Sequence, residues 1–178
     1  TTETGYSSSP FSEDGYELYR LTSTALFLNI VSRFFQEPLQ EIQGYSLIPE
    51  TTEWPTSSLA QMTAWIAELV GVRYLDDSKP LPELGDQPVW VFGTAFHFIN
   101  LIDQRFARSL PPGSLLIETG GTKGRSRSVT RDQLFRELSV SLGVKPASIV
   151  SEYGMCELAC QAYDFVDPKS PEISKRGF

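Results

Sequence analysis

Histidine and cysteine are scarce in this 178-residue sequence, which has one histidine and two cysteines. A zinc site built on several histidines is therefore excluded. Cys156 and Cys160 lie four positions apart, which on a helix would place them on one face but not at disulfide geometry. Together with the distant His97 they match no common zinc spacing. We expect both thiols to be reduced, as in a cytoplasmic protein.

Positive charge is also in short supply, since 15 Lys and Arg stand against 22 Asp and Glu, a formal net charge of −7. Proteins that bind nucleic acid through its phosphates present a basic face, so we expect no nucleic-acid partner. No apolar run approaches the roughly 18–20 residues of a membrane span. The sequence also lacks the basic start, apolar core and cleavage site of a secretory signal. We therefore expect a cytoplasmic protein with no membrane span.

The residues that are present indicate one globular domain. An apolar fraction of 40% and a charged fraction of 21% are typical of a folded chain of this length. Apolar spacing predicts helices at 14–37, 58–70, 95–109 and 130–142, and strands at 44–49, 89–92, 115–117, 148–152 and 161–165. Strands separated by helices predict an α/β fold, a mostly parallel sheet with helices on both faces. Residues 1–12 and 167–178 are expected to be poorly ordered ends of this single domain.

Three local patterns refine this prediction. The first helix is expected to bury one apolar stripe, made of Leu18, Leu21, Ala25, Leu28, Val31 and Phe35. Ser58 and Gln61 predict a capping box at the start of the second helix, and residues 76–88 an exposed connection. Arg125, Arg127 and Arg131 form a basic cluster that is either a solvated loop or a contact for phosphates or a carrier partner.

Two apolar strands run into polar, glycine-bearing segments. The strand Leu115–Ile117 is followed by Glu118-Thr119-Gly120-Gly121-Thr122-Lys123-Gly124, and the strand at Ile149 and Val150 by Glu152-Tyr153-Gly154-Met155-Cys156-Glu157. Parallel strands carry such turns to one edge of the sheet, where ligands bind. An aromatic ring, a close backbone approach and a carboxylate suit a nucleotide and its magnesium ion. An ordinary turn at the end of a buried strand remains the alternative.

These two segments resemble those of the adenylate-forming, acyl-activating enzymes, and within them the acyl-protein synthetases that activate fatty acids in bacterial luminescence. The resemblance covers roughly residues 14–164. It implies that the chain is the central part of such an enzyme's large domain. It also implies that ATP and magnesium activate a fatty or other carboxylic acid as an acyl-adenylate. The acyl group then passes to a thiol of an acyl-accepting partner protein.

The resemblance assigns roles to individual residues. It places Gly120, Gly121 and Thr122 beside the adenine and ribose, and Glu152, Tyr153 and Gly154 around the base, with Tyr153 stacking. Met155 and Cys156 continue this ATP-binding segment, and Glu157 is the catalytic carboxylate that holds magnesium. Thr1 and Thr2 resemble the end of a phosphate-binding loop. The acyl pocket is assigned to Trp54, Thr56 and His97, for which a surface-loop aromatic and a structural histidine remain the alternatives.

The sequence departs from the family pattern in ways that keep other functions open. Cys156 replaces a threonine, and a thiol is a weaker hydrogen-bond donor than a hydroxyl. The phosphate loop is incomplete and the small domain that carries the family's catalytic lysine is not recognised, so we expect the isolated chain to be inactive. A carboxylate–coenzyme A ligase and a non-catalytic α/β binding module that kept only the fold are the two alternatives.

Overall fold

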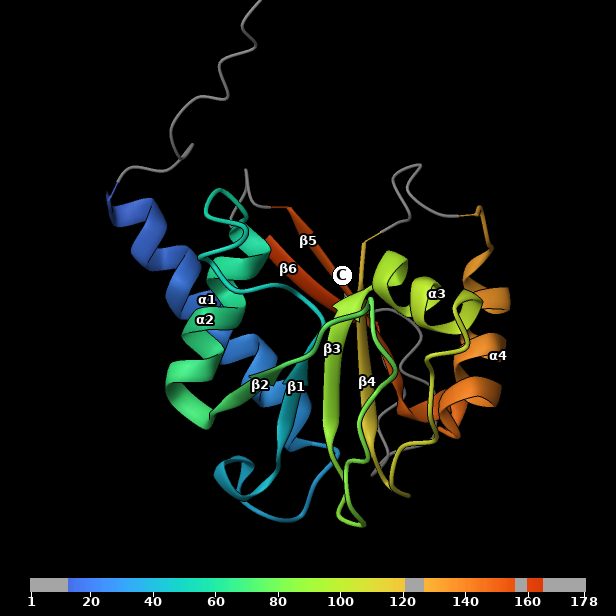
Figure 1. Ribbon diagram of the computed structural model, residues 1–178. Coiled ribbons are helices and arrows are strands. Elements are labelled where there is room, and N and C mark those ends of the chain that lie inside the picture. Colours follow the sequence, from blue (N-terminus) through green and yellow to red (C-terminus); the bar gives the residue numbers. More distant parts are fainter. Residues whose placement is uncertain (1–12, 121–126, 156–159, 165–178) are drawn as a thin grey trace, which may run out of the picture.

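The structure is a computed structural model that describes residues 13–120, 127–155 and 160–164. Figure 1 shows a central sheet with helices on both sides. The helices are α1 (Glu13–Ser32), α2 (Ser58–Val70), α3 (Ala95–Asp103) and α4 (Arg131–Leu142), with the 3-10 helices η1 (Leu39–Glu41) and η2 (Pro146–Ser148). The strands are β1 (Gly44–Ser46), β2 (Val72–Tyr74), β3 (Trp90–Thr94), β4 (Leu115–Thr119), β5 (Ile149–Met155) and β6 (Cys160–Asp164).

Within these described residues, six strands form one sheet in the order β2-β1-β3-β4-β5-β6. The pairs from β2 to β5 are parallel, and β6 runs antiparallel to β5. Helices α2, α3 and α4 each connect one strand to its parallel neighbour, the crossover that parallel pairing requires. The prediction of an α/β fold with a mostly parallel sheet is confirmed. None of the described helices is long and apolar enough to cross a membrane.

Helices cover both faces of the sheet, so its central strands are apolar on both sides. In β3, Trp90 and Phe92 belong to the cluster that packs against α1 and α2, whereas Val91 belongs to the cluster against α3 and α4. In β5, Val150 joins the first cluster and Ile149 the second. We call these sides the α1/α2 face and the α3/α4 face, at the left and right of Figure 1. Because side chains alternate along a strand, this pattern assigns a face to each strand residue.

The predicted apolar stripe of the first helix is wrong over its first half. Leu18 and Leu21 are 55% and 58% exposed, and Ala25 is exposed as well. The buried side of α1 instead carries Tyr19, Ser23, Thr24, Phe27, Ile30 and Val31. Leu28 is half-buried, and Val31 and Phe35 are buried as expected. The helix also ends at Ser32, before the predicted position 37.

The buried side of α1 tolerates polar residues because they are hydrogen-bonded within the helix. Thr24 lies on the buried side because its hydroxyl donates to the carbonyl of Arg20 at 2.7 Å, which satisfies it without water. Ser23 donates to the same carbonyl at 3.3 Å. Because α1 has apolar residues on two sides, its contacts with the sheet decide which side is buried. The large ring of Phe27, packed edge-on against Trp90 and Phe92, defines the buried side.

Helix boundaries follow their caps, with two corrections. Ser57 caps α2, since its hydroxyl accepts a hydrogen bond from the main-chain N–H of Ala60 at 3.2 Å. The predicted capping box at Ser58 is therefore wrong by one residue. Helix α3 ends at Asp103 rather than near 109. Helix α4 is confirmed, with Thr130 as its N-cap and Gly143 in the left-handed region at φ 67° as its C-cap.

Several strand boundaries differ from the prediction. Strand β1 ends at Ser46 rather than 49, and β4 continues to Thr119, so Glu118 and Thr119 lie in the strand rather than in the segment after it. The short edge strand β2 directly follows α2 and was not predicted. Strand β5 continues to Met155, so Glu152, Tyr153 and Gly154 lie in a strand rather than in the expected turn. The cause is the antiparallel pairing of β5 with β6, in which Tyr153 lies opposite Ala162. The strand predicted at 161–165 is confirmed as β6.

The buried side of α1 can be tested by truncating one residue on each side of the helix. Phe27→Ala should destabilise the protein by about 3–5 kcal/mol, because a fully buried ring leaves a cavity beside Trp90. The control Leu21→Ala, at a 58% exposed side chain, should cost less than about 0.5 kcal/mol. Urea unfolding monitored by circular dichroism measures both. Equal costs, or a larger cost at Leu21, would contradict the observed packing of α1.

Candidate functional site

The two glycine-bearing segments begin side by side at the carboxyl edge of the sheet. Strands β4 and β5 are parallel neighbours, and Thr119, the last residue of β4, is paired with Glu152. Gly120 follows Thr119 directly, and Tyr153 follows Glu152. The common edge expected from the strand order is therefore present, and it is the edge at which open α/β sheets bind ligands.

A buried carboxyl lies at this edge on the α3/α4 face. Glu118, which is 7% exposed, accepts a hydrogen bond from the Ser151 hydroxyl of the neighbouring strand. Burial raises the pKa of Glu118 above its ordinary value. The Ser151 hydrogen bond and the charge of Arg131 act to lower this pKa, and the charge of Glu152 acts to raise it. Glu118 is thus a desolvated carboxyl whose charged form is only partly compensated.

A second buried carboxyl lies at the same edge on the α1/α2 face. Glu152, which is 5% exposed, accepts a hydrogen bond from the Thr119 hydroxyl. Burial raises the pKa of Glu152, while hydrogen bonds from Thr119 and Gln161 act to lower it. Burial, together with the charge of Glu152, also raises the pKa of the Tyr163 phenol. The end of the β4–β5 pair therefore carries one hydroxyl–carboxyl pair on each face.

Gly154 makes room for the Glu152 carboxylate. A Cβ added at Gly154 would lie 2.6 Å from Oε1 of Glu152, well inside van der Waals contact. The glycine of this segment thus has a role within the protein itself, in addition to any approach by a ligand. Tyr153, between these two residues, is 66% exposed. By strand alternation it lies on the α3/α4 face, as Ser151 does.

An open hollow of about 280 Å³ lies beside Glu118 on the α3/α4 face. Its walls are Ala95, Glu118, Gly120, Val129, Thr130, Arg131 and Leu134. Gly120 has φ 68°, and no atom of the described residues lies within 4 Å of the position that its Cβ would occupy. The guanidinium of Arg131 lies 4.9 Å from the centre of the Phe135 ring and pairs with Asp164 at 2.5 Å. The hollow thus combines apolar walls, a bare backbone and a buried carboxyl.

The residues predicted for the acyl pocket lie near the same edge. Trp54 is half-buried, and its ring centre lies 5.9 Å from that of His97. Thr56 is exposed on the same segment as Trp54. His97 is buried and belongs to the capping box of α3, with Nδ1 2.9 Å from Oγ1 of Thr94. The structure brings Trp54 and His97 together and also gives His97 a structural role.

Several predicted residues fall where the structure makes no statement. Thr1, Thr2, Gly121, Thr122, Cys156 and Glu157 lie outside the described residues, as does the side chain of Met155. The predicted magnesium ligand Glu157 is among them. Across residues 13–120, 127–155 and 160–164, no three His, Cys, Asp or Glu side chains gather as a metal site.

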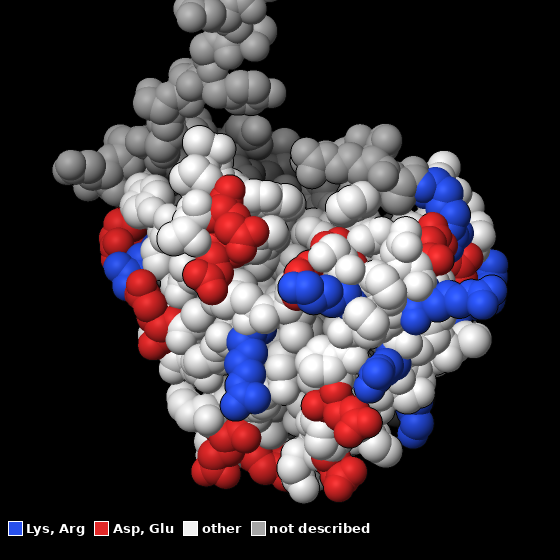
Figure 2. Space-filling view, in the orientation of Figure 1, with Lys and Arg blue, Asp and Glu red and all other residues white. Residues whose placement is uncertain are grey.

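The described part of the basic cluster is neutralised by acidic partners. Arg127 bridges Asp103, at 3.0 Å, and Glu137. Arg131 pairs with Asp164. Figure 2 shows basic side chains interspersed with acidic ones on the side of α3 and α4. The solvated-loop interpretation of these arginines is therefore favoured over a contact for phosphates.

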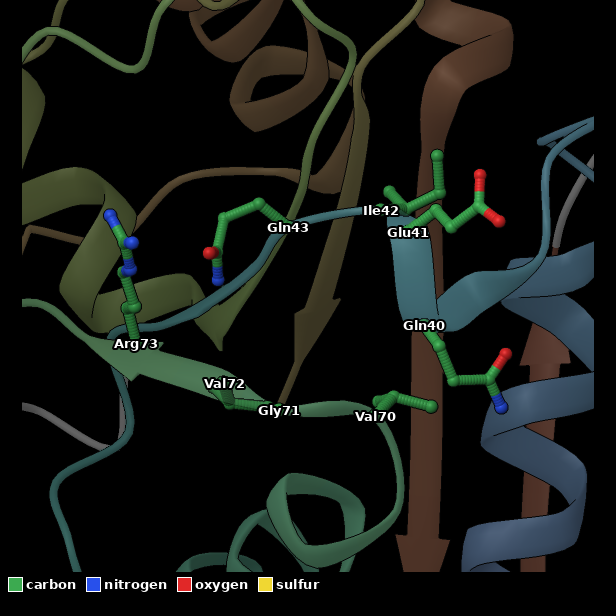
Figure 3. A pocket seen from close by; sticks show the side chains of 8 residues that line it. All are labelled: Gln40, Glu41, Ile42, Gln43, Val70, Gly71, Val72 and Arg73. Atoms are coloured by element: carbon green, nitrogen blue, oxygen red, sulfur yellow. The ribbon is translucent and has the colours of Figure 1, made fainter.

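A second hollow, of about 320 Å³, lies at the opposite edge of the sheet. Figure 3 shows that its side chains come from the segment entering β1 and from the segment between α2 and β2. Its polar side chains, such as Gln40, Glu41 and Arg73, are exposed. None of the residues predicted for a site lies there, and the amino ends of parallel strands are not where this fold class binds ligands.

Sequence reasoning gave no role to Glu118 and Ser151. The available signal was the position of Glu118 directly after three apolar strand residues, which indicates a buried carboxyl. Because charged residues are rarely buried without a partner, this position also predicts a polar partner. Its partner is 33 positions away and emerges only from the β4–β5 register.

Neither a protein-family model nor a curated protein sequence matches this chain. The resemblance to acyl-activating enzymes thus stays a hypothesis about its two glycine-bearing segments.

Replacing Glu118 by glutamine should change stability in a pH-dependent way. The folded-state pKa of Glu118 is raised above 4.5, so between these two values the folded protein binds more protons than the unfolded chain. The contribution of Glu118 to stability is complete below about pH 4.5 and declines as the pH rises through the folded pKa. Glutamine does not ionise and still accepts from Ser151. Urea titrations from about pH 4 to about pH 7 should therefore show Glu118→Gln gaining stability relative to the wild type.

Glu83→Gln, at an exposed carboxylate, is the matched control for this titration. A constant or falling stability difference for Glu118→Gln would contradict the burial of the Glu118 carboxyl.

The contact between Gly154 and Glu152 can be measured with a double-mutant cycle. Gly154→Ala should destabilise the protein because the added methyl group meets the Glu152 carboxylate. In the Glu152→Ala background the same change should cost clearly less, with a coupling energy of about 1 kcal/mol. Additive effects of the two substitutions on the free energy of unfolding would exclude the contact.

Proposed function

We propose that this chain binds ATP where β4 and β5 end, and that it acts in activating a fatty or other carboxylic acid as an acyl-adenylate. In this proposal the acyl group passes afterwards to a protein thiol. One observation carries the proposal: the register of β4 and β5 pairs Thr119 with Glu152, the residues directly before Gly120 and Tyr153. Gly120 and Tyr153 belong to the two segments that resemble the acyl-activating enzymes.

The local geometry supports a nucleotide at this edge. The ring of Tyr153 is 66% exposed, whereas Ile149, Val150 and Glu152 of the same strand are buried, so it can stack on a base. Gly120 has a positive φ and no atom of the described residues within 4 Å of its Cβ position, which suits a backbone that a ligand approaches closely. Gly121 and Thr122 follow directly in the sequence and complete this side of the proposed site.

The reaction requires two anions, a carboxylate and a triphosphate, to approach each other. Positioning and charge neutralisation are therefore the main tasks of the protein. Glu157 is the residue proposed to hold magnesium, which supplies positive charge beside the phosphates. Trp54, Thr56 and His97 form the proposed wall for the acid, and the proximity of the Trp54 and His97 rings supports this grouping.

Binding of ATP and of a non-hydrolysable acyl-sulfamoyl adenosine, measured by calorimetry, tests the proposal. Tyr153→Ala should weaken both ligands roughly 5- to 150-fold, because stacking on an aromatic ring contributes about 1–3 kcal/mol per base. Glu157→Ala should weaken ATP in the presence of magnesium and affect acyl-sulfamoyl adenosine less, because that analogue lacks the β- and γ-phosphates that share the metal ion. Val140→Ala, at an 84% exposed side chain of α4, is the control and should bind both ligands as the wild type does.

Absence of binding to the wild-type chain, or affinities unchanged by Tyr153→Ala and Glu157→Ala, would overturn the proposed function.

A further inference from the structure

Three groups at the carboxyl edge share the α3/α4 face. The Glu118 carboxyl lies at the side of the hollow, and the Ser151 hydroxyl donates to it. Two residues further along β5, the exposed ring of Tyr153 lies on the same face by strand alternation. Glu152 lies on the other face, bonded to Thr119. The carboxyl that shares a face with the Tyr153 ring is therefore that of Glu118, to which the sequence analysis assigned no role.

The hollow suits one flat ring system. Its volume of about 280 Å³ is slightly below the roughly 300–1,000 Å³ of typical ligand pockets, so it fits part of a ligand rather than a whole nucleotide. Ala95, Val129 and Leu134 give it apolar walls, as a purine requires. Gly120, at its margin, connects it to the segment proposed to carry the ribose and phosphates.

The carboxyl at its side can accept further hydrogen bonds. An ionised carboxylate offers about four lone-pair positions, and Ser151 uses one of them. The buried Glu118 carboxylate has lost its water and is only partly stabilised by Ser151, so a further hydrogen-bond donor to it is favourable. A hydrogen bond to a desolvated charge is stronger than one between neutral groups. Arg131, the nearby cation, is already paired with Asp164 and packed on Phe135. Among the described residues Ser151 is the hydrogen-bond donor to Glu118, and a ligand can supply a further one.

We propose that Glu118 selects the base of the bound nucleotide by accepting a hydrogen bond from the 6-amino group of adenine, while Tyr153 stacks on the ring. This inference rests on the proposed nucleotide site and adds the residue that makes it specific for adenine. Hypoxanthine carries a carbonyl oxygen at the same position and would face the carboxylate with another acceptor. Unsubstituted purine offers no group there.

Competition binding on the wild-type chain tests the inference without any substitution. ATP should bind roughly 10- to 100-fold more tightly than purine-riboside triphosphate, which lacks the amino group, and than inosine triphosphate. Both analogues keep the sugar, the phosphates and a ring that stacks on Tyr153. The ratio of affinities therefore isolates the contact with the amino group.

The Glu118→Gln variant then identifies the residue responsible. A carboxamide both accepts and donates, so it can face either the amino group of adenine or the carbonyl of hypoxanthine. The preference for ATP over inosine triphosphate should fall to within about threefold. Glu83→Gln, at an exposed carboxylate that pairs with Arg108 and does not line the hollow, should keep the full wild-type preference.

The outcomes separate this inference from the proposed function. Equal wild-type affinity for ATP and purine-riboside triphosphate would overturn the role of Glu118 and leave the nucleotide site standing. An undiminished preference in a folded Glu118→Gln variant would overturn it as well. Failure of all three triphosphates to bind the wild-type chain would overturn both proposals together.

Discussion

The lateral pairing of β4 with β5 brings together the described residues proposed to bind the nucleotide. Thr119 and Glu152 lie opposite each other at its end, and their side chains are joined on the α1/α2 face. One residue earlier, Glu118 and Ser151 are joined in the same way on the α3/α4 face. Main-chain pairing and two hydroxyl–carboxyl contacts thus fix the same register. Thr119 and Glu152, which directly precede Gly120 and Tyr153, are held side by side as a result, although 33 residues separate them in the chain.

The fold class could be predicted because its signals are local. Short apolar runs separated by helical spacing specify a parallel sheet covered on both faces, and the cap of α4 at Thr130 was readable from the residue types alone. The buried side of α1 could not be predicted, because that helix has apolar residues on two sides. Which side is buried depends on the edge-on contacts of the Phe27 ring with Trp90 and Phe92, which belong to a distant segment of the chain.

The candidate site was only partly predictable. The sequence located Gly120 and Tyr153, and the strand order placed them at one edge. It also led us to expect a turn at Glu152, since glycine and polar residues there suggested the end of a strand. The pairing with β6 extends β5 instead, and strand alternation then places Tyr153 and Glu152 on different faces. The link between Ser151 and Glu118 spans two strands, so no local pattern could have revealed it.

Because side chains alternate along β5, the two faces of the sheet carry different groups at this point. On one side a phenol ring is open to solvent, and on the other a carboxyl is enclosed by Thr119 and Gly154. Inserting or deleting one residue between Ile149 and Glu152 would turn each following side chain to the other face of the sheet. The Tyr153 ring would then be buried and the Glu152 carboxyl exposed. We therefore expect substitutions along this short stretch to be tolerated more readily than any change in its length.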